Sequence, residues 1–313
     1  MQRAIERLLR RLKLPAVREV VFNAGIFAAF LLLSRARLPD SLAPFATAAA
    51  AAAWCAGLQL SALLGCFAGL ATVASIDGAL SLAVTLAAAW ALKRYSGRTV
   101  KRQVMFAIAL GELSALAAFR TSSPYAAMMG ALSAAAAVRL FVVYHSALRT
   151  LLTLKIRKIL SEEEVVSLCV LCGTALLGLV DVAPFGISLS AVLGGCVTLL
   201  LAYTGGAGAG AACGIALGVM LALGGNADVL VFLGAMGVIA GGMKKLGRPG
   251  TAAGCMMAGA AIAVYSRSDA SAFAASVFAA ALFLAVPNAV LSQISRFVNA
   301  SLRRERSRQE YLF

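Results

Sequence analysis

The stretch GGAGAGAACGIALG, from Gly205 to Gly218, is compatible with two very different folds. A glycine-rich loop that cradles phosphate follows a strand of a soluble domain and usually ends with a lysine. Here no Lys or Arg occurs between Lys158 and Lys244, and the flanking residues are apolar. The stretch is therefore predicted to form a membrane helix and not a phosphate-binding loop.

Four glycines of this stretch recur at every fourth position, which places them along one face of a helix. Small residues in such a row let two membrane helices approach closely, and van der Waals packing then drives their association. We expect this face to pack against another helix, from either the same chain or a second copy. It consists of Gly206, Gly210, Gly214 and Gly218.

The composition of the whole chain supports a membrane fold. Of its 313 residues, 61% are hydrophobic and 13% are charged, whereas soluble domains carry roughly 25% charged residues. The mean hydropathy is +0.90. An all-α polytopic membrane protein is therefore predicted. Its apolar runs fall near 19–34, 41–56, 58–75, 79–93, 104–120, 125–148, 163–180, 187–203, 206–223, 229–243, 250–266 and 271–292.

The number of transmembrane helices follows from the length of these runs. Several are shorter than the ~20 residues that a helix needs to cross a bilayer, so two neighbours could form one bent segment, and about 10–12 transmembrane helices are predicted. With twelve spans and a cytoplasmic N-terminus, 23 Lys and Arg residues fall inside, 4 fall outside, and Arg139 lies within a span. This distribution obeys the positive-inside rule.

The basic N-terminus, residues 1–18, contains no signal-peptide cleavage site before the first apolar run. That pattern favours a cytoplasmic N-terminus in a bacterial inner membrane. The net charge of +15 then reflects topology and contact with anionic membrane lipids. Nucleic-acid binding is not indicated, because the basic residues lie in scattered short loops without interleaved aromatic residues.

Three short motifs recur in the two halves of the chain, which suggests an internal repeat. The halves, 19–153 and 154–292, would each contain six spans and would run parallel because six is an even number. Residues 293–313 would begin a cytoplasmic linker helix that leads into a further domain. The motif pairs are EVV at Glu19 and Glu164, DSLAPF (Asp40–Phe45) and DVAPF (Asp181–Phe185), and KRYSGR (Lys93–Arg98) and KKLGR (Lys244–Arg248).

The second motif pair is predicted to mark two helix starts at the outer surface. Proline is tolerated in the first turn of a helix, where its missing N–H is not needed. The residues of this motif are Pro44, Phe45, Pro184 and Phe185.

Glu112 is the one acidic residue inside a predicted span, and Arg139 is the one deep basic residue. An ionisable residue in the membrane is a functional hypothesis by default, here transport or proton transfer. In the structural alternative, Arg139 extends to the interface, and Glu112 stays protonated or bonds a neighbouring helix. The two could also pair, although their depths differ by ~9 Å at 1.5 Å per residue.

Other reactive residue types give weaker patterns. The CVLC motif (Cys169–Cys172) has redox or metal spacing, but it lies in an apolar span without a second pair. Free buried cysteines are therefore expected. His145, the single histidine, has no acidic cluster near it in the sequence, so no metal site is predicted.

The order of these features resembles the N-terminal membrane domain of the stage II sporulation protein E family of endospore-forming bacteria. The resemblance covers nearly the whole chain, and that family is usually described with ten spans. Its most specific part is the block around the glycine row, followed by a Gln-Glu-Tyr stretch. The matching segments are LPDSLAPFA (Leu38–Ala46), LSEEEVVSLCVL (Leu160–Leu171), LLLAYTGGAGAGAACGIALG (Leu199–Gly218) and RSRQEYLF (Arg306–Phe313).

The resemblance implies that a cytoplasmic serine phosphatase of the type 2C (PPM) family follows this chain and uses manganese or magnesium. It implies dephosphorylation of an anti-sigma factor antagonist, which activates the forespore sigma factor, and association with the tubulin-like division protein at the asymmetric septum. For this chain it implies membrane anchoring, septal localisation, cytoplasmic termini and homo-oligomerisation, with no catalytic or metal residue. The implied linker contains Arg303, Arg304, Glu310 and Tyr311.

Two other function classes compete with this membrane anchor. A secondary transporter or small-solute membrane protein is suggested by the repeat and by Glu112. An intramembrane enzyme would need paired acids, a histidine cluster or a Ser–Lys pair at depth, and the sequence offers none of these. The anchor is the reading that the sequence favours.

Overall fold

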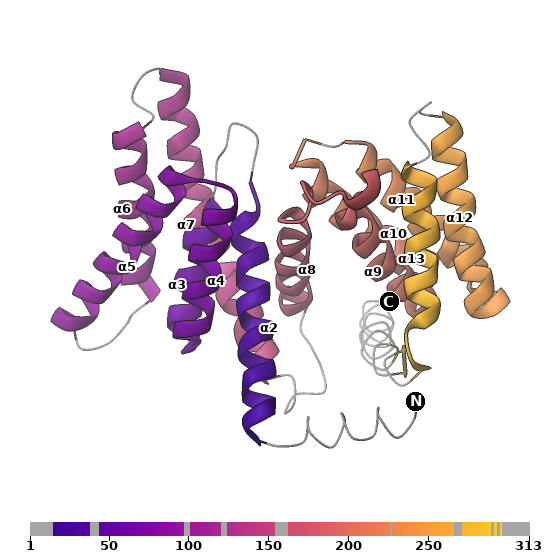
Figure 1. Ribbon diagram of the computed structural model, residues 1–313, viewed down its shortest axis with the longest axis horizontal. Coiled ribbons are helices and arrows are strands. Elements are labelled where there is room, and N and C mark those ends of the chain that lie inside the picture. Colours follow the sequence, from indigo (N-terminus) through magenta and orange to yellow (C-terminus); the bar gives the residue numbers. More distant parts are fainter. Residues whose placement is uncertain are drawn as a thin grey trace, which may run out of the picture. The chain divides into compact units, whose positions relative to one another are not determined.

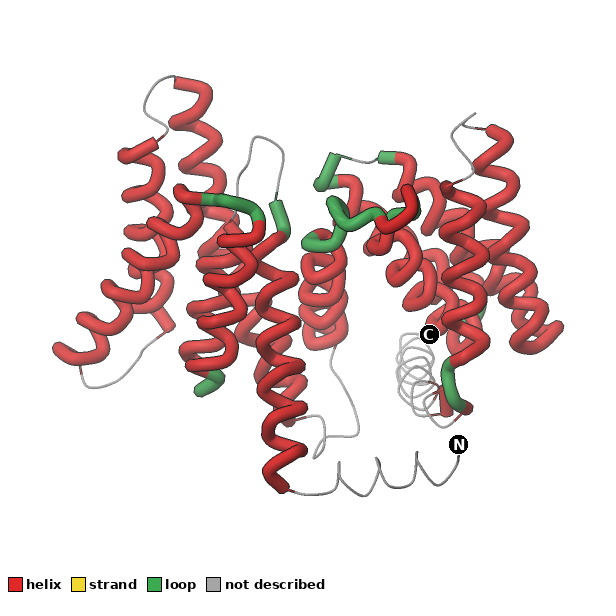
Figure 2. The backbone as a smooth tube through the Cα atoms, viewed as in Figure 1, coloured by secondary structure: helices red, strands yellow, loops and turns green. Residues whose placement is uncertain are grey.

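The computed structural model describes residues 15–37, 44–96, 101–119, 124–153, 162–225, 227–265, 271–288, 291–292 and 295. All regular structure in these residues is helical (Figures 1 and 2), which confirms the predicted all-α polytopic membrane fold. Each predicted apolar run overlaps one α-helix. The helices are α2 (Pro15–Arg35), α3 (Pro44–Ala56), α4 (Gln59–Thr72), α5 (Ile76–Ser96), α6 (Lys101–Phe119), α7 (Pro124–Thr153), α8 (Glu162–Leu177), α9 (Leu189–Gly205), α10 (Ala207–Ala222), α11 (Asp228–Gly242), α12 (Gly247–Tyr265) and α13 (Ser271–Ala285), with the short 3₁₀ helices η2 (Pro184–Gly186) and η3 (Met243–Leu246).

Four helical stretches are long and apolar enough, by length and composition, to cross a membrane: 76–95, 101–119, 124–153 and 228–265. The last stretch contains α11, η3 and α12. Other apolar helices are shorter. The 13 residues of α3, for example, extend over about 20 Å, less than the ~30 Å hydrocarbon core. The number of membrane spans therefore stays a prediction.

The described residues separate into two compact units. Unit 1 contains the described residues of 1–35 and 42–145, and unit 2 contains those of 36–41 and 146–313. The boundary lies inside α7, so that α2 to α6 and most of α7 form unit 1. Helices α8 to α13 belong to unit 2.

Unit 1 is built around α3, which contacts α2, α4, α5 and α6. This helix is mostly alanine, and Phe45, Ala46 and residues 48–53 are at most 3% exposed. Because alanine side chains are small, several helices can surround α3 closely. Helix α4 also packs closely on α2, because a Cβ atom added to Gly65 would lie 2.5 Å from the carbonyl oxygen of Phe27.

Unit 2 is built around α9, which contacts α8, α10, α11, α12 and α13. Its closest helix pair is formed by α10 and α11. A Cβ atom added to Gly210 would lie 2.6 Å from the carbonyl oxygen of Gly237, and one added to Gly218 would lie 2.7 Å from the Cα atom of Leu230. At Gly214 an added Cβ would overlap the carbonyl group of Leu233. These three glycines thus face a helix of the same chain.

Gly206 has a different role from the other glycines of the row. It lies between α9 and α10 with φ +86°, and an added Cβ atom there would meet nothing within 4 Å. Its N–H donates to the carbonyl group of Ala202 at the end of α9. This left-handed conformation suits glycine at a helix end. Gly206 thus connects the two helices, and its backbone also lies against α11, because a Cβ atom added to Gly241 would lie 2.8 Å from the carbonyl carbon of Gly206.

The two units share one order of neighbouring helices. Adding six to each helix number of a unit 1 pair gives a pair that is also in contact in unit 2. The agreement covers α2 to α6 and α8 to α12, and an internal repeat would produce such a pattern in these helices. The contacting pairs of unit 1 are α2–α3, α2–α4, α3–α4, α3–α5, α3–α6, α4–α5 and α5–α6, and those of unit 2 include α8–α9, α8–α10, α9–α10, α9–α11, α9–α12, α10–α11 and α11–α12.

The lysines of the third motif pair also occupy corresponding places. In unit 1, the ammonium group of Lys93 lies 5.5 Å from the centre of the Trp54 ring, in the last turn of α3. In unit 2, the Lys244 ammonium donates a 2.6 Å hydrogen bond to the carbonyl group of Thr204, in the last turn of α9. Each lysine therefore lies at the C-terminal end of the central helix of its own unit, where a positive charge is favourable.

Candidate functional site

Glu112 lies on α6 in the interior of unit 1, where its side chain is 8% exposed. Three hydroxyl groups from three other helices donate to its carboxyl group. Thr47 on α3 and Ser81 on α5 lie 2.7 and 2.9 Å from Oε1, and Ser133 on α7 lies 3.2 Å from Oε2. We call these four side chains the Glu112 cluster.

Glycines bring the helices of the cluster together. A Cβ atom added to Gly111, the residue before Glu112, would lie 2.5 Å from the carbonyl oxygen of Ser81. One added to Gly130 on α7 would overlap the side chain of Leu116 on α6. Both α5 and α7 can therefore approach α6 closely enough for short serine side chains to reach the carboxyl group.

The cluster is polar but contains no basic side chain. Within the described residues, the hydrogen-bond partners of Glu112 are the three hydroxyl groups. Arg139 lies six residues beyond Ser133 on α7 and is exposed. The structure thus shows Glu112 bonded to neighbouring helices, which was one of the structural alternatives, and does not pair it with Arg139.

Sequence reasoning singled out Glu112 but missed its three partners. An acidic residue in an apolar span is conspicuous, whereas serine and threonine are common in membrane helices. Their hydroxyl groups usually donate to a backbone carbonyl one turn earlier, as Thr198 does to Gly194 in α9. No signal in one sequence distinguishes a hydroxyl that turns to its own backbone from one that turns to a carboxyl group.

The other candidate residues are dispersed. Cys169 and Cys172 are half-buried free thiols. The other cysteines are also free thiols, and each of them is half-buried or buried. In the part of the chain that the structure describes, no three His, Cys, Asp or Glu side chains gather as a metal site would require. His145 stacks on Phe141 with ring centres 6.0 Å apart. Arg303, Arg304, Glu310 and Tyr311 lie outside the described residues.

The two copies of the Pro-Phe motif differ in structure. Pro44 is the first residue of α3, and Phe45 is 3% exposed. Pro184 instead begins the three-residue helix η2, and Phe185 is 101% exposed with φ +58°. The long helix α9 begins only at Leu189, after the N-cap Ser188.

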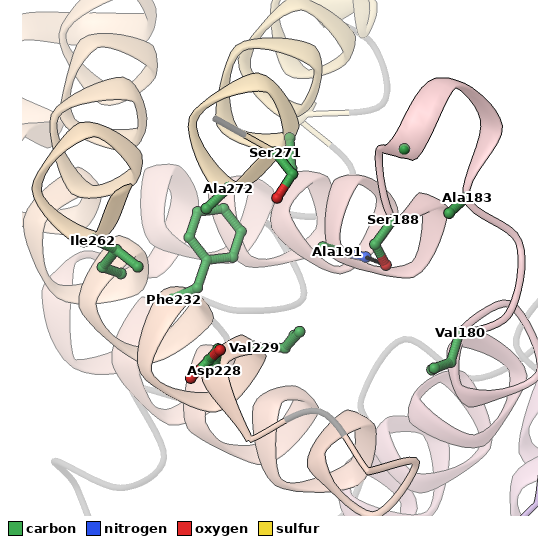
Figure 3. A pocket seen from close by; sticks show the side chains of 12 residues that line it. Val180, Ala183, Ser188, Ala191, Asp228, Val229, Phe232, Ile262, Ser271 and Ala272 are labelled. Carbon is green, nitrogen blue, oxygen red and sulfur yellow. Dashed lines mark hydrogen bonds between the residues drawn. The ribbon is translucent and has the colours of Figure 1, made fainter. Parts of the chain in front are cut away.

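A cavity of about 310 Å³ opens in unit 2 near η2 (Figure 3). Its lining is mostly apolar, with the carboxylate of Asp228 and two serine hydroxyl groups as polar exceptions. Such a concave, partly polar space could hold a small ligand. The residues around it include Ser188 and Ala191 of the α9 start, Asp228 and Phe232 of α11, Ile262 of α12, and Ser271 and Ala275 of α13.

Arg248, near the start of α12, holds the end of α13. Its guanidinium group donates to the carbonyl groups of Phe283, Leu284 and Val286 at 2.6–3.1 Å and to the amide oxygen of Asn288 at 2.8 Å. The last carbonyl groups of a helix are otherwise unsatisfied, and a cation there also interacts favourably with the helix dipole. Arg248 therefore holds the C-terminal end of α13 beside the start of α12.

Comparison with known proteins agrees with the expectation from the sequence. A family model described as "SpoIIE, N-terminal domain" matches residues 1–295. A curated relative, stage II sporulation protein E of Bacillus subtilis (strain 168), is 25% identical over 162 residues, an alignment that covers 50% of this chain and 20% of the relative. The chain thus matches about a fifth of that relative's length. No solved structure matches the chain. Because the family model covers nearly every residue, the protein belongs to the family of SpoIIE N-terminal domains.

Proposed function

We propose that this chain is the membrane domain that anchors a sporulation-specific serine phosphatase and places it at the asymmetric septum. The observation that carries the proposal is the family match over residues 1–295, in a chain whose described residues form an all-α polytopic membrane fold. On this proposal a downstream type 2C domain dephosphorylates the anti-sigma factor antagonist, which activates the forespore sigma factor. The tubulin-like division protein would bind the cytoplasmic part.

The catalytic metal is assigned to that downstream domain. Manganese or magnesium in such enzymes is held by carboxylates, and the described residues here contain no group of three potential ligands. This chain would contribute position and not chemistry. The Arg248 contacts support such a role, since they fix the end of α13 from which the linker to a cytoplasmic domain would continue.

Homo-oligomerisation is part of the proposal, but the structure limits the surfaces available for it. Gly210, Gly214 and Gly218 are covered by α11 of the same chain. A contact between copies would therefore use other faces. Lipid-facing helices such as α6, where Phe106 is 63% exposed, are suitable.

The test is a replacement experiment in sporulating cells. Residues 1–295 of the full-length protein are exchanged for an unrelated polytopic domain with the same terminal orientation, and a fluorescent tag reports position. We expect the tag to leave the asymmetric septum and sigma-factor activation to fall, while the phosphatase activity of the soluble part stays unchanged. Unaltered septal placement and activation would refute the proposal.

A secondary transporter is the second candidate, and the Glu112 cluster is the observation that favours it. The exchange of Glu112 for glutamine in a flux assay separates the two functions. Loss of solute or proton flux in reconstituted vesicles would favour transport. Absence of flux in the wild-type protein would leave the anchor as the function.

A further inference from the structure

Two of the three hydroxyl groups around Glu112 differ from most other buried hydroxyls of the described residues, which donate to a backbone carbonyl. Thr85 and Thr174 donate to backbone carbonyl groups of their own helices at 2.8 and 2.9 Å, as Ser and Thr commonly do in apolar helices. Ser81 and Ser133 have the carboxyl group of Glu112 as their partner instead. Oxygen atoms from four helices therefore converge on one point inside unit 1.

Among the described residues, the hydrogen-bond partners of Glu112 are uncharged hydroxyl groups, so the protein supplies no bonded cation for an ionised carboxylate there. An ionised carboxylate buried among apolar helices is costly unless a cation accompanies it. Among the titratable side chains on the described parts of α3, α5, α6 and α7, Asp77 is the one whose charge acts on Glu112, and it is also negative. The others are Cys55, Lys93, Arg94, Tyr95, Lys101, Arg102, Tyr125, Arg139, Tyr144, His145 and Arg149.

We propose that Glu112, Thr47, Ser81 and Ser133 form a binding site for a small monovalent metal cation of the sodium class, for which protons compete. Carboxylate and hydroxyl oxygens are the hard ligands that such cations prefer. The single carboxylate balances one positive charge, which selects a monovalent ion over calcium or magnesium. A hydroxyl group that turns its proton back to the carbonyl one turn earlier presents its lone pairs to the ion.

Binding of the ion at this site would stabilise the helix packing of unit 1. Its ligands come from α3, α5, α6 and α7, so binding draws four helices together, while loss of the ion leaves the carboxylate to bind a proton instead. The inference does not rest on the proposed function, because the cation is bound by this domain alone.

The experiment measures thermal unfolding of the purified protein in lipid nanodiscs, with sodium chloride replaced by choline chloride at constant ionic strength. We expect sodium to raise the melting temperature, because a ligand that binds the folded state stabilises it. At low pH the sodium concentration needed should rise by about tenfold per pH unit, because each bound cation displaces one proton.

Three variants test the assignment to the cluster. Glu112→Gln keeps the shape of the side chain but removes its charge, and its NH2 group donates where a carboxyl oxygen accepted, so it should abolish the sodium response. Ser133→Ala keeps the charge and should weaken the apparent sodium affinity by roughly tenfold, as expected for one lost polar contact. Glu163→Gln, an exposed carboxyl group at the start of α8, is the matched control and should respond like the wild type.

Two results would overturn the inference. If sodium does not change the melting temperature of the wild-type protein at any pH, Glu112 binds only a proton. A sodium response that persists in Glu112→Gln shows that the ion binds elsewhere. Either result can occur while septal localisation is intact, so it is distinguishable from failure of the proposed function.

Discussion

Units 1 and 2 have the same order of neighbouring helices but different contents. In unit 1, α3, α5, α6 and α7 meet at the Glu112 cluster. In unit 2, the corresponding helices α9, α11, α12 and α13 each line the cavity of about 310 Å³. Unit 2 thus adopts this order without a buried acidic residue among its described residues. The helix order does not require the carboxyl group, which suggests that Glu112 serves another purpose than folding.

The units also use their glycines on different faces. In unit 1, Gly65 and Gly69 of α4 face α2, where an added Cβ atom would lie 2.5 Å from the carbonyl oxygens of Phe27 and Leu31 respectively. In unit 2, the glycines of α10 face α11. The positions of close approach therefore differ between two units that share one set of neighbouring helices.

The largest difference between the two units is expected when the phenylalanine of the Pro-Phe motif is replaced by alanine in each of them. Phe45→Ala removes a side chain that is 3% exposed and should destabilise the protein by about 3–5 kcal/mol. Phe185→Ala removes a side chain that is 101% exposed and should change stability by no more than about 0.5 kcal/mol. Thermal unfolding in nanodiscs measures both, and similar losses for the two variants would contradict the difference in burial.

Gly214→Leu tests the closest helix pair of unit 2. A side chain there must push α10 away from the Leu233 carbonyl group, and overpacking of this kind costs about 3 kcal/mol. Gly208→Leu is the control on the same helix, because an added Cβ atom meets nothing within 4 Å. We expect Gly214→Leu to lower the melting temperature and Gly208→Leu to leave it nearly unchanged. Equal effects would mean that the row does not pack as described.

The all-α polytopic membrane fold could be predicted from the sequence, because the lengths and positions of the apolar runs indicate the helices. Pro44, for example, begins α3 where the motif predicts a helix start. The rest depends on three-dimensional neighbours. The spacing of the glycines predicts a shared face, but it does not reveal that Gly206 also forms the turn between α9 and α10 with a positive φ. Glu112 stands out in one sequence, whereas Ser133 becomes informative only when α7 lies beside α6.

Thr47→Val tests whether a hydroxyl group of the Glu112 cluster contributes more to stability than a buried threonine hydroxyl group of unit 2. Valine keeps the volume but removes the hydroxyl group that lies 2.7 Å from Glu112, which should cost about 1–3 kcal/mol because a buried polar group loses a partner. In unit 2, Thr174→Val removes only bonds to the backbone of α8, so a smaller loss is expected. Melting temperatures of the two variants decide the point, and a larger loss for Thr174→Val would count against the cluster.

The smallest effect is expected at the cavity of unit 2. Ala275 lines this space, so Ala275→Leu can extend into it and should stabilise the protein by up to about 1 kcal/mol. Ala279, one turn further along α13, is fully buried. It packs closely against α9, because a Cβ atom added to Gly195 would lie 3.0 Å from the Cβ atom of Ala279. Ala279→Leu should therefore destabilise the protein by about 1–3 kcal/mol, since no space receives the larger side chain. A stabilised Ala275→Leu beside a destabilised Ala279→Leu would show that unit 2 keeps open a space that its own packing could fill, which is expected of a binding cavity and not of an ordinary core.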